Sequence, residues 1–194
     1  MTHHLESGVV VDRIFDAVAK GDNWGDALDA AAEYCGADAM LLLDGNLSGG
    51  DPAVIDATGF KTEVLDLYTE NHLRDDELVR ESMAGPVGVV ISSAHDRWEW
   101  DFYDSTMYRR LLWPCGLHYL AGTALINAPK VYASLWMGRK EGSGEFAPHN
   151  LQGLSELVPH FGRAMAVHHR LRRAEMQAEL ATGAFDRVSV GVVL

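Results

Sequence analysis

A pair of strand-like segments separated by a tight turn constrains the fold of this chain more than any other feature. Residues 117–126 and 131–137 are rich in apolar and aromatic side chains, and only Asn-Ala-Pro-Lys at 127–130 separates them. Strands joined by so short a connection must run antiparallel. A second pair of short apolar segments, 39–43 and 53–58, flanks the turn-rich stretch DGNLSGGDP. The sequence therefore predicts an antiparallel sheet.

Helical periodicity dominates the segments around these strands. Apolar residues recur there at spacings of three and four, which is the pattern of a helix with one buried face. The predicted helices span residues 5–20, 24–35, 60–72, 98–113 and 149–183, residues 87–92 form a further strand, and residues 73–84 are too polar to assign. Helices interspersed with about five antiparallel strands define the α+β class, with helices covering at least one face of the sheet.

The turn predicted at Ala128 and Pro129 pairs Ile126 with Val131 and so determines which side chains share a face. One face is then ordinary core. The other mixes large aromatic side chains with small and hydroxyl ones, a composition that leaves space and hydrogen-bonding groups for a small ligand. The alternative is a tightly packed second core, in which the polar atoms of tyrosine and tryptophan only form hydrogen bonds within the protein. The candidate ligand contacts on this face are Tyr119, Thr123, Tyr132, Ser134 and Trp136.

A second aromatic group precedes this hairpin. Residues 94–119 hold three of the five tryptophans of the chain, along with several tyrosines. Such a cluster is able to wall a binding cavity, but more often it forms a lid or a patch of core. The candidate ligand contacts from this group are Trp98, Tyr103 and Trp113.

The last predicted helix carries a narrow apolar seam. From His149 onward, apolar residues recur at spacings of three and four, as they do in a coiled coil. Beyond Met165 the sequence HHRLRRAEMQAEL is too polar for burial on all sides, so we expect the helix to project and to pair with a copy of itself. The alternative is that it folds back on its own domain. The predicted contacts of the homodimer are Leu154, Leu157, Phe161, Ala164, His168 and Leu171.

The charge of the chain limits its partners. The formal net charge is -12 and the pI is about 5.0, and nucleic acid binding needs clustered cations, so we do not expect this chain to bind DNA itself. No stretch approaches the roughly 20 apolar residues that cross a bilayer. Cys35 and Cys115 lie far apart and lack the spacing of a redox or zinc motif. We therefore expect a cytoplasmic protein with reduced thiols and no membrane contact.

Catalytic and metal-binding motifs find no support. The nine histidines occur singly or as sequence neighbours, and His168 and His169 point about 100° apart on a helix, so they cannot share an ion as H-E-x-x-H does. Gly142-Ser-Gly-Glu-Phe146 is not a G-x-S-x-G nucleophile elbow. No nucleophile and base are paired by their spacing. We expect a protein that is not an enzyme and has no metal site, and the cofactor, if one exists, is unknown.

Five segments carry a family resemblance. They are WGDALDAAAEYCGADA from Trp24, YTENHLRDD from Tyr68, FY at Phe102, LWPCGLH from Leu112 and LVPHFGRAM from Leu157. Together they resemble the amino-terminal sensory region of bacterial LuxR-type transcription regulators, over nearly the whole chain. The resemblance implies a GAF-like or PAS-like fold, an antiparallel sheet with helices around it that pairs through terminal helices.

The resemblance also implies ligand contacts. The same superfamily includes autoinducer receptors, in which an aspartate near a tyrosine-rich helix holds an acyl-homoserine lactone. Asp76 follows Tyr68 at a comparable distance, which makes both residues candidates. Glu77 stands where an Asp-Pro pair is usual, so the resemblance specifies an architecture rather than a ligand.

These observations lead to one hypothesis and two alternatives. Residues 1–150 would form a sensory domain, residues 151–183 a signalling and dimerisation helix, and residues 184–194 a truncated tail or the start of a further module. A small molecule bound between the sheet and the helices would bias the angle of the paired helices without catalysis. DNA would be bound only by a module absent from this chain. The alternatives are a ligand-free dimerisation scaffold and an enzyme of unknown reaction.

Overall fold

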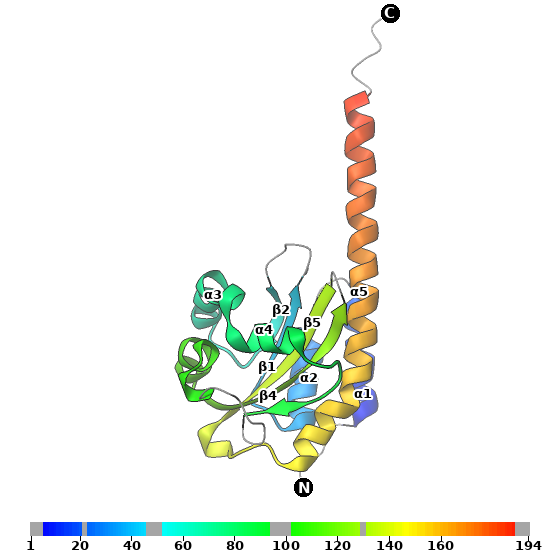
Figure 1. Cartoon of the computed structure of the whole chain (residues 1–194). Coiled ribbons are helices and arrows are strands. Elements are labelled where there is room, and N and C mark those ends of the chain that lie inside the picture. Colours follow the sequence, from blue (N-terminus) through cyan, green and yellow to red (C-terminus); the bar gives the residue numbers. More distant parts are fainter. Residues whose placement is uncertain (1–5, 21–22, 46–51, 94–101, 129–130, 189–194) are drawn as a thin grey trace, which may run out of the picture.

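The computed structural model describes residues 6–20, 23–45, 52–93, 102–128 and 131–188 (Figure 1). Its strands are β1 (Ala39–Gly45), β2 (Ala53–Thr58), β3 (Ile91–Ser92), β4 (Leu117–Ala128) and β5 (Val131–Lys140). Its α-helices are α1 (Ser7–Lys20), α2 (Gly25–Cys35), α3 (Thr62–Asn71), α4 (Glu77–Ala84) and α5 (Pro148–Val188). Both predicted hairpins are present, because β1 pairs with β2 and β4 pairs with β5.

The strands form one antiparallel sheet in the order β2-β1-β5-β4-β3. The α+β class predicted from the hairpins is confirmed, with helices flanking the sheet and the long α5 at the end of the chain. β1 lies inside the sheet, and residues 39–43 are each at most 1% exposed. A strand that is covered on both faces has no polar side, which explains its unbroken apolar run.

Alternate side chains of β1 enter two separate hydrophobic cores. Met40 and Leu42 belong to the first core, which forms with α1, α2 and the base of α5. Leu41 and Leu43 belong to the second core, which forms with α3, α4 and the helical turns that follow residue 102. In Figure 1, α4 crosses in front of the strands and α2 lies behind them. The sheet is therefore covered by helices on both faces.

The helix predicted at 98–113 is correct only in part, because the continuous helical residues begin at 106 and take π-helical and then 3-10 geometry. Residues 98–101 lie outside the described residues, and most of the remainder forms short turns: η2 (Phe102–Asp104), the π-helical η3 (Tyr108–Leu112) and η4 (Trp113–Cys115). The side chain of Ser105 accepts a 3.1 Å hydrogen bond from the backbone N–H of Tyr108, so a new turn begins there. The aromatic residues of this segment continue at helical spacing across Ser105, so the sequence pattern did not indicate the interruption.

The polar segment 73–84, whose secondary structure the sequence did not predict, is divided into two elements at Asp76. The turn η1 (Leu73–Asp75) precedes this residue and α4 follows it. Asp76 Oδ1 accepts hydrogen bonds from the N–H groups of Leu78 at 2.9 Å and Val79 at 3.3 Å, as an N-cap does. The capping carboxylate explains why a helix starts in so polar a segment.

The strand predicted at 87–92 is shorter than expected. Only Ile91 and Ser92 form β3, and Val87 makes an isolated bridge to Ala124. Gly88 between them has φ of 81°, a left-handed conformation that interrupts an extended strand.

The first half of α5 is part of the domain. Leu154, Leu157, Phe161 and Ala164 are at most 1% exposed in the first core, and His168 is 6% exposed. The expectation that these five residues contact a second copy is therefore wrong. For this part of the helix the alternative holds, because α1, α2 and β4 already offer it an apolar surface within the same chain.

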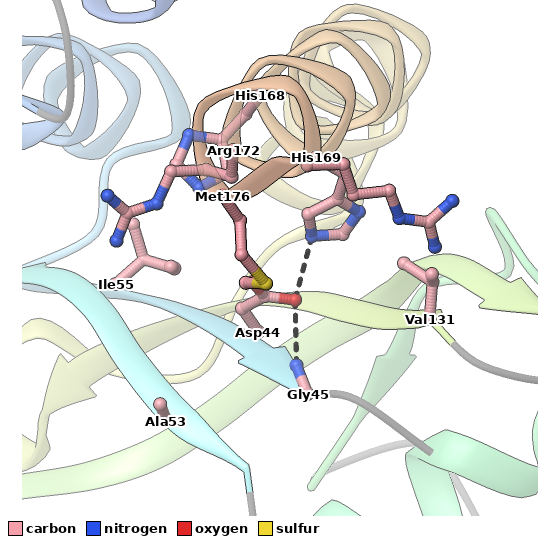
Figure 2. A pocket seen from close by; sticks show the side chains of 10 residues that line it. Asp44, Gly45, Ala53, Ile55, Val131, His168, His169, Arg172 and Met176 are labelled. Atoms are coloured by element: carbon pink, nitrogen blue, oxygen red, sulfur yellow. Dashed lines mark hydrogen bonds and ion pairs between the residues drawn. The ribbon is translucent and has the colours of Figure 1, made fainter. Parts of the chain in front are cut away.

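The second half of α5 projects beyond the sheet (Figure 1). It leaves the domain where His169 Nε2 lies 2.8 Å from Asp44 Oδ1 at the end of β1 (Figure 2). Leu171 is 47% exposed, so this residue of the seam stays accessible to a partner. None of the described helices is long and apolar enough to cross a membrane.

The end of α5 differs from the prediction. The helix continues past Gly183 to Val188, so the predicted end of the helix at 183 is wrong. A glycine costs a helix only about 1 kcal/mol, too little to end it. Residues 189–194 lie outside the described residues, and a further module after them stays a prediction.

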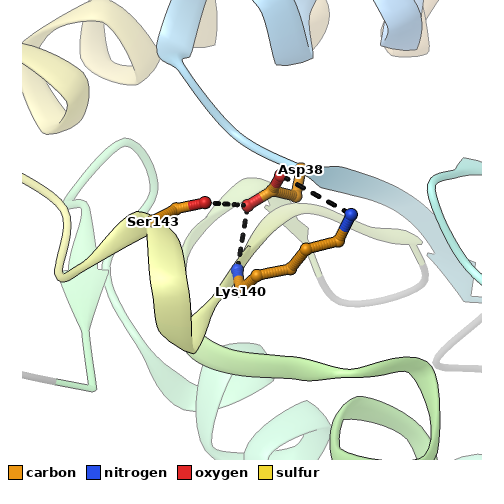
Figure 3. Close-up of polar contacts among 3 residues, drawn as sticks. All are labelled: Asp38, Lys140 and Ser143. Atoms are coloured by element: carbon orange, nitrogen blue, oxygen red, sulfur yellow. Dashed lines mark hydrogen bonds and ion pairs between the residues drawn. The ribbon is translucent and has the colours of Figure 1, made fainter.

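Asp38 fastens the start of β1 to the end of β5. Its Oδ2 accepts hydrogen bonds from the backbone N–H of Lys140 at 2.9 Å and the hydroxyl of Ser143 at 3.0 Å (Figure 3). The ammonium group of Lys140 lies 4.0 Å from Oδ1 of the same carboxylate. These contacts hold the connection that leads from β5 into α5.

The packing of α5 on the domain can be measured at Phe161. Its ring stacks on that of Trp24, with 6.3 Å between centroids. We expect Phe161→Ala to lower the free energy of unfolding by about 3–5 kcal/mol, because it leaves a cavity in the first core. Leu180→Ala is the control on the same helix, and it should cost less than about 1 kcal/mol because Leu180 is 69% exposed. Urea denaturation followed by circular dichroism measures both, and similar losses would contradict this packing.

Candidate ligand site between the sheet and helices α3 and α4

The register of the β4–β5 hairpin differs from the predicted one. Ile126 lies opposite Ala133, whereas Val131 lies opposite Ala128. The register also shifts between Ala124 and Ile126, where β4 has an irregularity of the bulge type. Because side chains alternate between the two faces of a strand, this change separates residues that were predicted to share a face.

The predicted mixed face is therefore divided between the two cores. Tyr119 packs against the first core, and Thr123 pairs with a residue of that core. Trp136 belongs to the second core on the opposite face, and Tyr132 and Ser134 share its face by alternation along β5. Only these last three residues remain together as a candidate ligand surface.

Polar side chains of β5 and α4 form hydrogen bonds on this face. Trp136 Nε1 donates a 2.9 Å hydrogen bond to Ser134 Oγ. The hydroxyls of Tyr132 and Ser82 are hydrogen-bonded to each other, which ties α4 to β5. All four side chains are at most 4% exposed. A small polar network is thus enclosed in an apolar layer.

The Tyr68 hydroxyl on α3 and Oδ2 of the capping residue Asp76 differ from this network because they lack hydrogen-bond partners among the described residues. Both residues are 0% exposed. The Tyr68 hydroxyl and Asp76 Oδ2 nevertheless have no hydrogen-bond partner among the described residues. Buried polar atoms almost always have a partner. These two atoms therefore mark a place for hydrogen bonds that the described part of the chain does not supply.

Burial controls the protonation of both groups. Burial raises the pKa of the Asp76 carboxyl to about 6, and the backbone N–H of Val79, the Tyr68 hydroxyl and the backbone N–H of Leu78 only partly offset this effect. Burial, and then the charge of Asp76, raises the pKa of Tyr68 well above its ordinary value. The two groups are close enough to interact, although their geometry is not that of a hydrogen bond. They offer a ligand one hydroxyl donor and one carboxyl group.

The ring of Trp136 is positioned by a glycine on the neighbouring strand. Gly122 of β4 lies opposite Trp136, and a Cβ atom at this position would overlap the indole ring. The ring therefore lies across β4, and its nitrogen is held by Ser134. This arrangement gives the second core a rigid aromatic wall.

The remaining predicted aromatic contacts are not part of this group. Trp98 lies outside the described residues. Tyr103 and Trp113 are 43% and 60% exposed. Their rings lie 5.0 Å and 6.2 Å from that of Tyr108, whose hydroxyl is hydrogen-bonded to His118 Nδ1 at 2.9 Å. Tyr103 and Trp113 are thus surface residues rather than walls of a buried cavity.

A hollow of about 310 Å³ opens between α3 and η3. Tyr68 forms part of its wall, with Arg109 and Arg110 of η3 on the other side. The hollow thus approaches the polar group from outside the second core. No spacing in the sequence indicates that α3 lies beside η3 or α4 beside β5, so neither this hollow nor the role of Ser82 was predictable from the sequence.

The described residues contain no group of histidine, cysteine, aspartate and glutamate that could hold a metal ion. Burial raises the pKa of the Cys35 thiol to about 12, which keeps it protonated and unreactive at neutral pH. Tyr68, Asp76 and Trp136 thus combine hydrogen-bonding groups with apolar surface in the second core.

Solved structures share this fold, whereas no protein-family model and no curated protein matches the sequence. The ligand-binding domain of VqsR from Pseudomonas aeruginosa gives a TM-score of 0.64 at 13% identity over 84% of this chain and 96% of that chain. CepR2 from Burkholderia cenocepacia, an N-acylhomoserine lactone dependent LuxR family transcription factor, gives 0.57 at 13% identity over 84% and 96%. The GAF domain of a phosphoenolpyruvate-protein phosphotransferase from Coxiella burnetii gives 0.54 at 16% identity over 89% and 99%.

These identities are low, so the likeness shows the fold alone. The fold is GAF-like, as the sequence resemblance implied. Domains with this fold occur in LuxR family regulators and also in a phosphotransferase, which means that the fold does not determine the function.

The buried carboxyl of Asp76 predicts a particular dependence of stability on pH. Its folded-state pKa of about 6 exceeds the ordinary value of 3.8, so the folded protein retains a proton that the unfolded chain has lost. The free energy of unfolding therefore falls as the pH rises from about 4 to about 6, by about 3 kcal/mol from this group. Asp76→Asn keeps an oxygen for the cap and should remove this part of the fall. Urea denaturation between about pH 4 and pH 7 measures it.

The control for this measurement is Asp75→Asn. Asp75 is the sequence neighbour of Asp76 and is exposed to water, so its replacement should shift the whole profile by a small constant amount. A wild-type profile that runs parallel to that of Asp76→Asn would show that Asp76 does not titrate in this range.

Proposed function

We propose that this chain is a sensory domain of a LuxR-type transcription regulator that binds a small molecule in the second core. One observation carries the proposal: the Tyr68 hydroxyl and Asp76 Oδ2 are fully buried near each other, and neither has a partner with hydrogen-bond geometry among the described residues. The network of Tyr132, Ser134 and Trp136 lies on the same side of the sheet. DNA would be bound by a module outside this chain, in keeping with its net charge of -12.

The surroundings of this pair favour a small ligand without negative charge. The second core supplies apolar walls, including Leu41, Leu43 and Trp136. An anionic group would lose its hydration there and would face the carboxyl of Asp76, whose pKa is about 6. A donor group on the ligand would pair with Asp76 Oδ2, and an acceptor would pair with the Tyr68 hydroxyl. An amide or hydroxyl group attached to an apolar body has the required chemistry.

A short chain of contacts connects this site to α5. Asp76 caps α4, and Ser82 of α4 is hydrogen-bonded to Tyr132 of β5. Tyr132 pairs with Gly45 of β1, the neighbour of Asp44, and Asp44 holds His169 where α5 leaves the domain. A ligand that binds Asp76 and alters the cap would therefore bias the position of α4 and, through β5 and β1, the direction of α5. This role is regulatory and needs no catalysis.

We further propose that the projecting half of α5 pairs with that of a second copy. Val167 and Leu171 are 40% and 47% exposed. Ala174, Ala178 and Ala181 continue this line at alternating spacings of three and four. The resulting seam, residues 167–181, is apolar and faces away from His169 and its contact with Asp44. In a homodimer that pairs along this seam, a change in the direction of α5 would change the orientation of the two copies relative to each other.

Ligand binding is tested by thermal shift against a library of small metabolites and acylated amides. A compound that raises the melting temperature should bind about tenfold more weakly to Tyr68→Phe, which lacks the hydroxyl donor, and to Asp76→Asn, which places an amide donor where Oδ2 accepts. Tyr103→Phe is the control, since Tyr103 is 43% exposed on the surface. Isothermal titration calorimetry gives the affinities. Silence across the library, or equal affinity in all variants, would favour the ligand-free dimerisation scaffold.

Dimerisation is tested with the double variant Leu171→Glu/Ala178→Glu. It places two carboxylates in the proposed seam, so we expect monomers in size-exclusion chromatography with light scattering, at concentrations where the wild type is a dimer. Met176→Glu introduces the same group on the opposite face of α5 and should remain dimeric. A monomeric wild type, or a dimeric double variant, would rule out pairing along residues 167–181.

A further inference from the structure

The seam of α5 has a charged residue on each of its two flanks, and the two charges are opposite. Its spacing assigns coiled-coil positions to residues 167–181, with a at 171 and 178 and d at 167, 174 and 181. The residue before each a is a g position and the residue after each d is an e position, and these positions border the seam. In the projecting half, Arg170 and Gln177 are the g residues, whereas Glu175 and Thr182 are the e residues. One flank is thus cationic and the other is anionic.

The two flanking charges are accessible to a second copy. Arg170 and Glu175 are both exposed. Neither takes part in an ion pair within the described part of the chain. Arg170 also has no acidic residue three or four positions away on α5, the spacing at which side chains on one helix meet. Its own helix therefore offers the guanidinium group no counter-charge.

We propose that α5 pairs with its copy in parallel and in register, and that Arg170 of each copy forms an ion pair with Glu175 of the other. In a parallel coiled coil, a g residue reaches the e residue five positions later on the second helix, which is the separation of Arg170 and Glu175. Two-fold symmetry forms the same ion pair on both sides of the seam. This inference rests on the homodimer proposed above and adds its orientation.

An antiparallel pair along the same seam does not form these contacts. Reversal of one helix brings its g flank against the g flank of the other, and its e flank against the e flank of the other. Arg170 then shares a flank with Arg170 and Gln177 of the second copy, and Glu175 shares one with Glu175 of the second copy. Opposite charges are separated and like charges are brought to one side. The charges that border the seam therefore favour the parallel orientation.

The parallel orientation gives the largest apolar contact a definite place. Val167 and Leu171, the largest side chains of the seam, then each meet their own copies where α5 leaves the sheet beside His169 and Asp44. Both sensory domains lie at this end of the paired helices, and the carboxy-terminal ends of both α5 helices lie together at the other. A change in the direction of α5 at His169 would thus act on the apolar layer that joins the two copies.

Charge reversal tests the ion pair. Arg170→Glu and Glu175→Arg each place like charges across both sides of the seam, so we expect each variant to raise the Kd of the dimer about tenfold. Arg170→Glu/Glu175→Arg restores opposite charges and should return the Kd to within about threefold of the wild type. Glu179→Arg is the matched control, because Glu179 is exposed on the same helix at a b position, away from both flanks. Analytical ultracentrifugation of the whole 194-residue chain measures the Kd.

An engineered disulfide tests the orientation. In a parallel pair in register, residue 181 faces residue 181 of the second copy, so Ala181→Cys should form an intermolecular disulfide under mild oxidation. In an antiparallel pair centred on the seam, these two residues lie about 15 Å or more apart along the helix axis. Leu180→Cys is the control, since Leu180 is 69% exposed but lies off the seam. The native thiols of Cys35 and Cys115 are buried, and non-reducing electrophoresis compares the rates of crosslinking.

The outcomes separate this inference from the proposed function. A dimer in which Ala181→Cys is crosslinked no faster than Leu180→Cys would overturn the parallel orientation and leave the homodimer and the ligand site standing. A double charge variant that dimerises no better than the single variants would overturn the ion pair. A monomeric wild type would remove the homodimer and its orientation together, whereas the ligand titrations would still decide the site in the second core.

Discussion

The pairing of β1 with β5 in the middle of the sheet is the constraint on which the rest of the structure depends. The two strands pair continuously from Ala39 and Gly138 to Gly45 and Tyr132. Side chains of both strands alternate between the faces, so the apolar run of β1 must supply two cores rather than one. Helices then have to cover both faces, and they do: α1, α2 and the base of α5 on one, α3 and α4 on the other.

The same pair of strands connects the contacts of α4 with those of α5. Tyr132, which is bound to Ser82 of α4, lies directly opposite Gly45. The next residue of β1, Asp44, faces the other side and is bound to His169 of α5. A single step along one strand thus links the layer of α4 to the layer of α5. A strand inside a sheet is hydrogen-bonded along both edges and is therefore stiff. A displacement of side chains on one face of such a strand thus also displaces the side chains on its other face.

Local patterns in the sequence were sufficient for most of the elements. The hairpins around 44–52 and 127–130 and the amphipathic helices α1 and α2 follow from turn residues and from spacings of two or three and four, which depend only on neighbouring residues. The patterns were insufficient where a single side chain redirects the backbone. Ser105 interrupts a helix and Gly88 interrupts a strand, although the apolar spacing continues through both residues. Gly183 does not end α5, although its position after the apolar pattern predicted that it would.

The sequence by itself determined the antiparallel α+β sheet, the long final helix, and Tyr68, Asp76 and the aromatic residues of β5 as candidates for ligand binding. Only the tertiary structure decided which of them meet. One irregularity in β4 moves Tyr119 and Thr123 to the face opposite Trp136, because alternation turns a shift of one residue into a change of side. The tertiary structure also decided that the first half of the seam is buried within its own chain, since an apolar helix face carries no information about which surface will cover it.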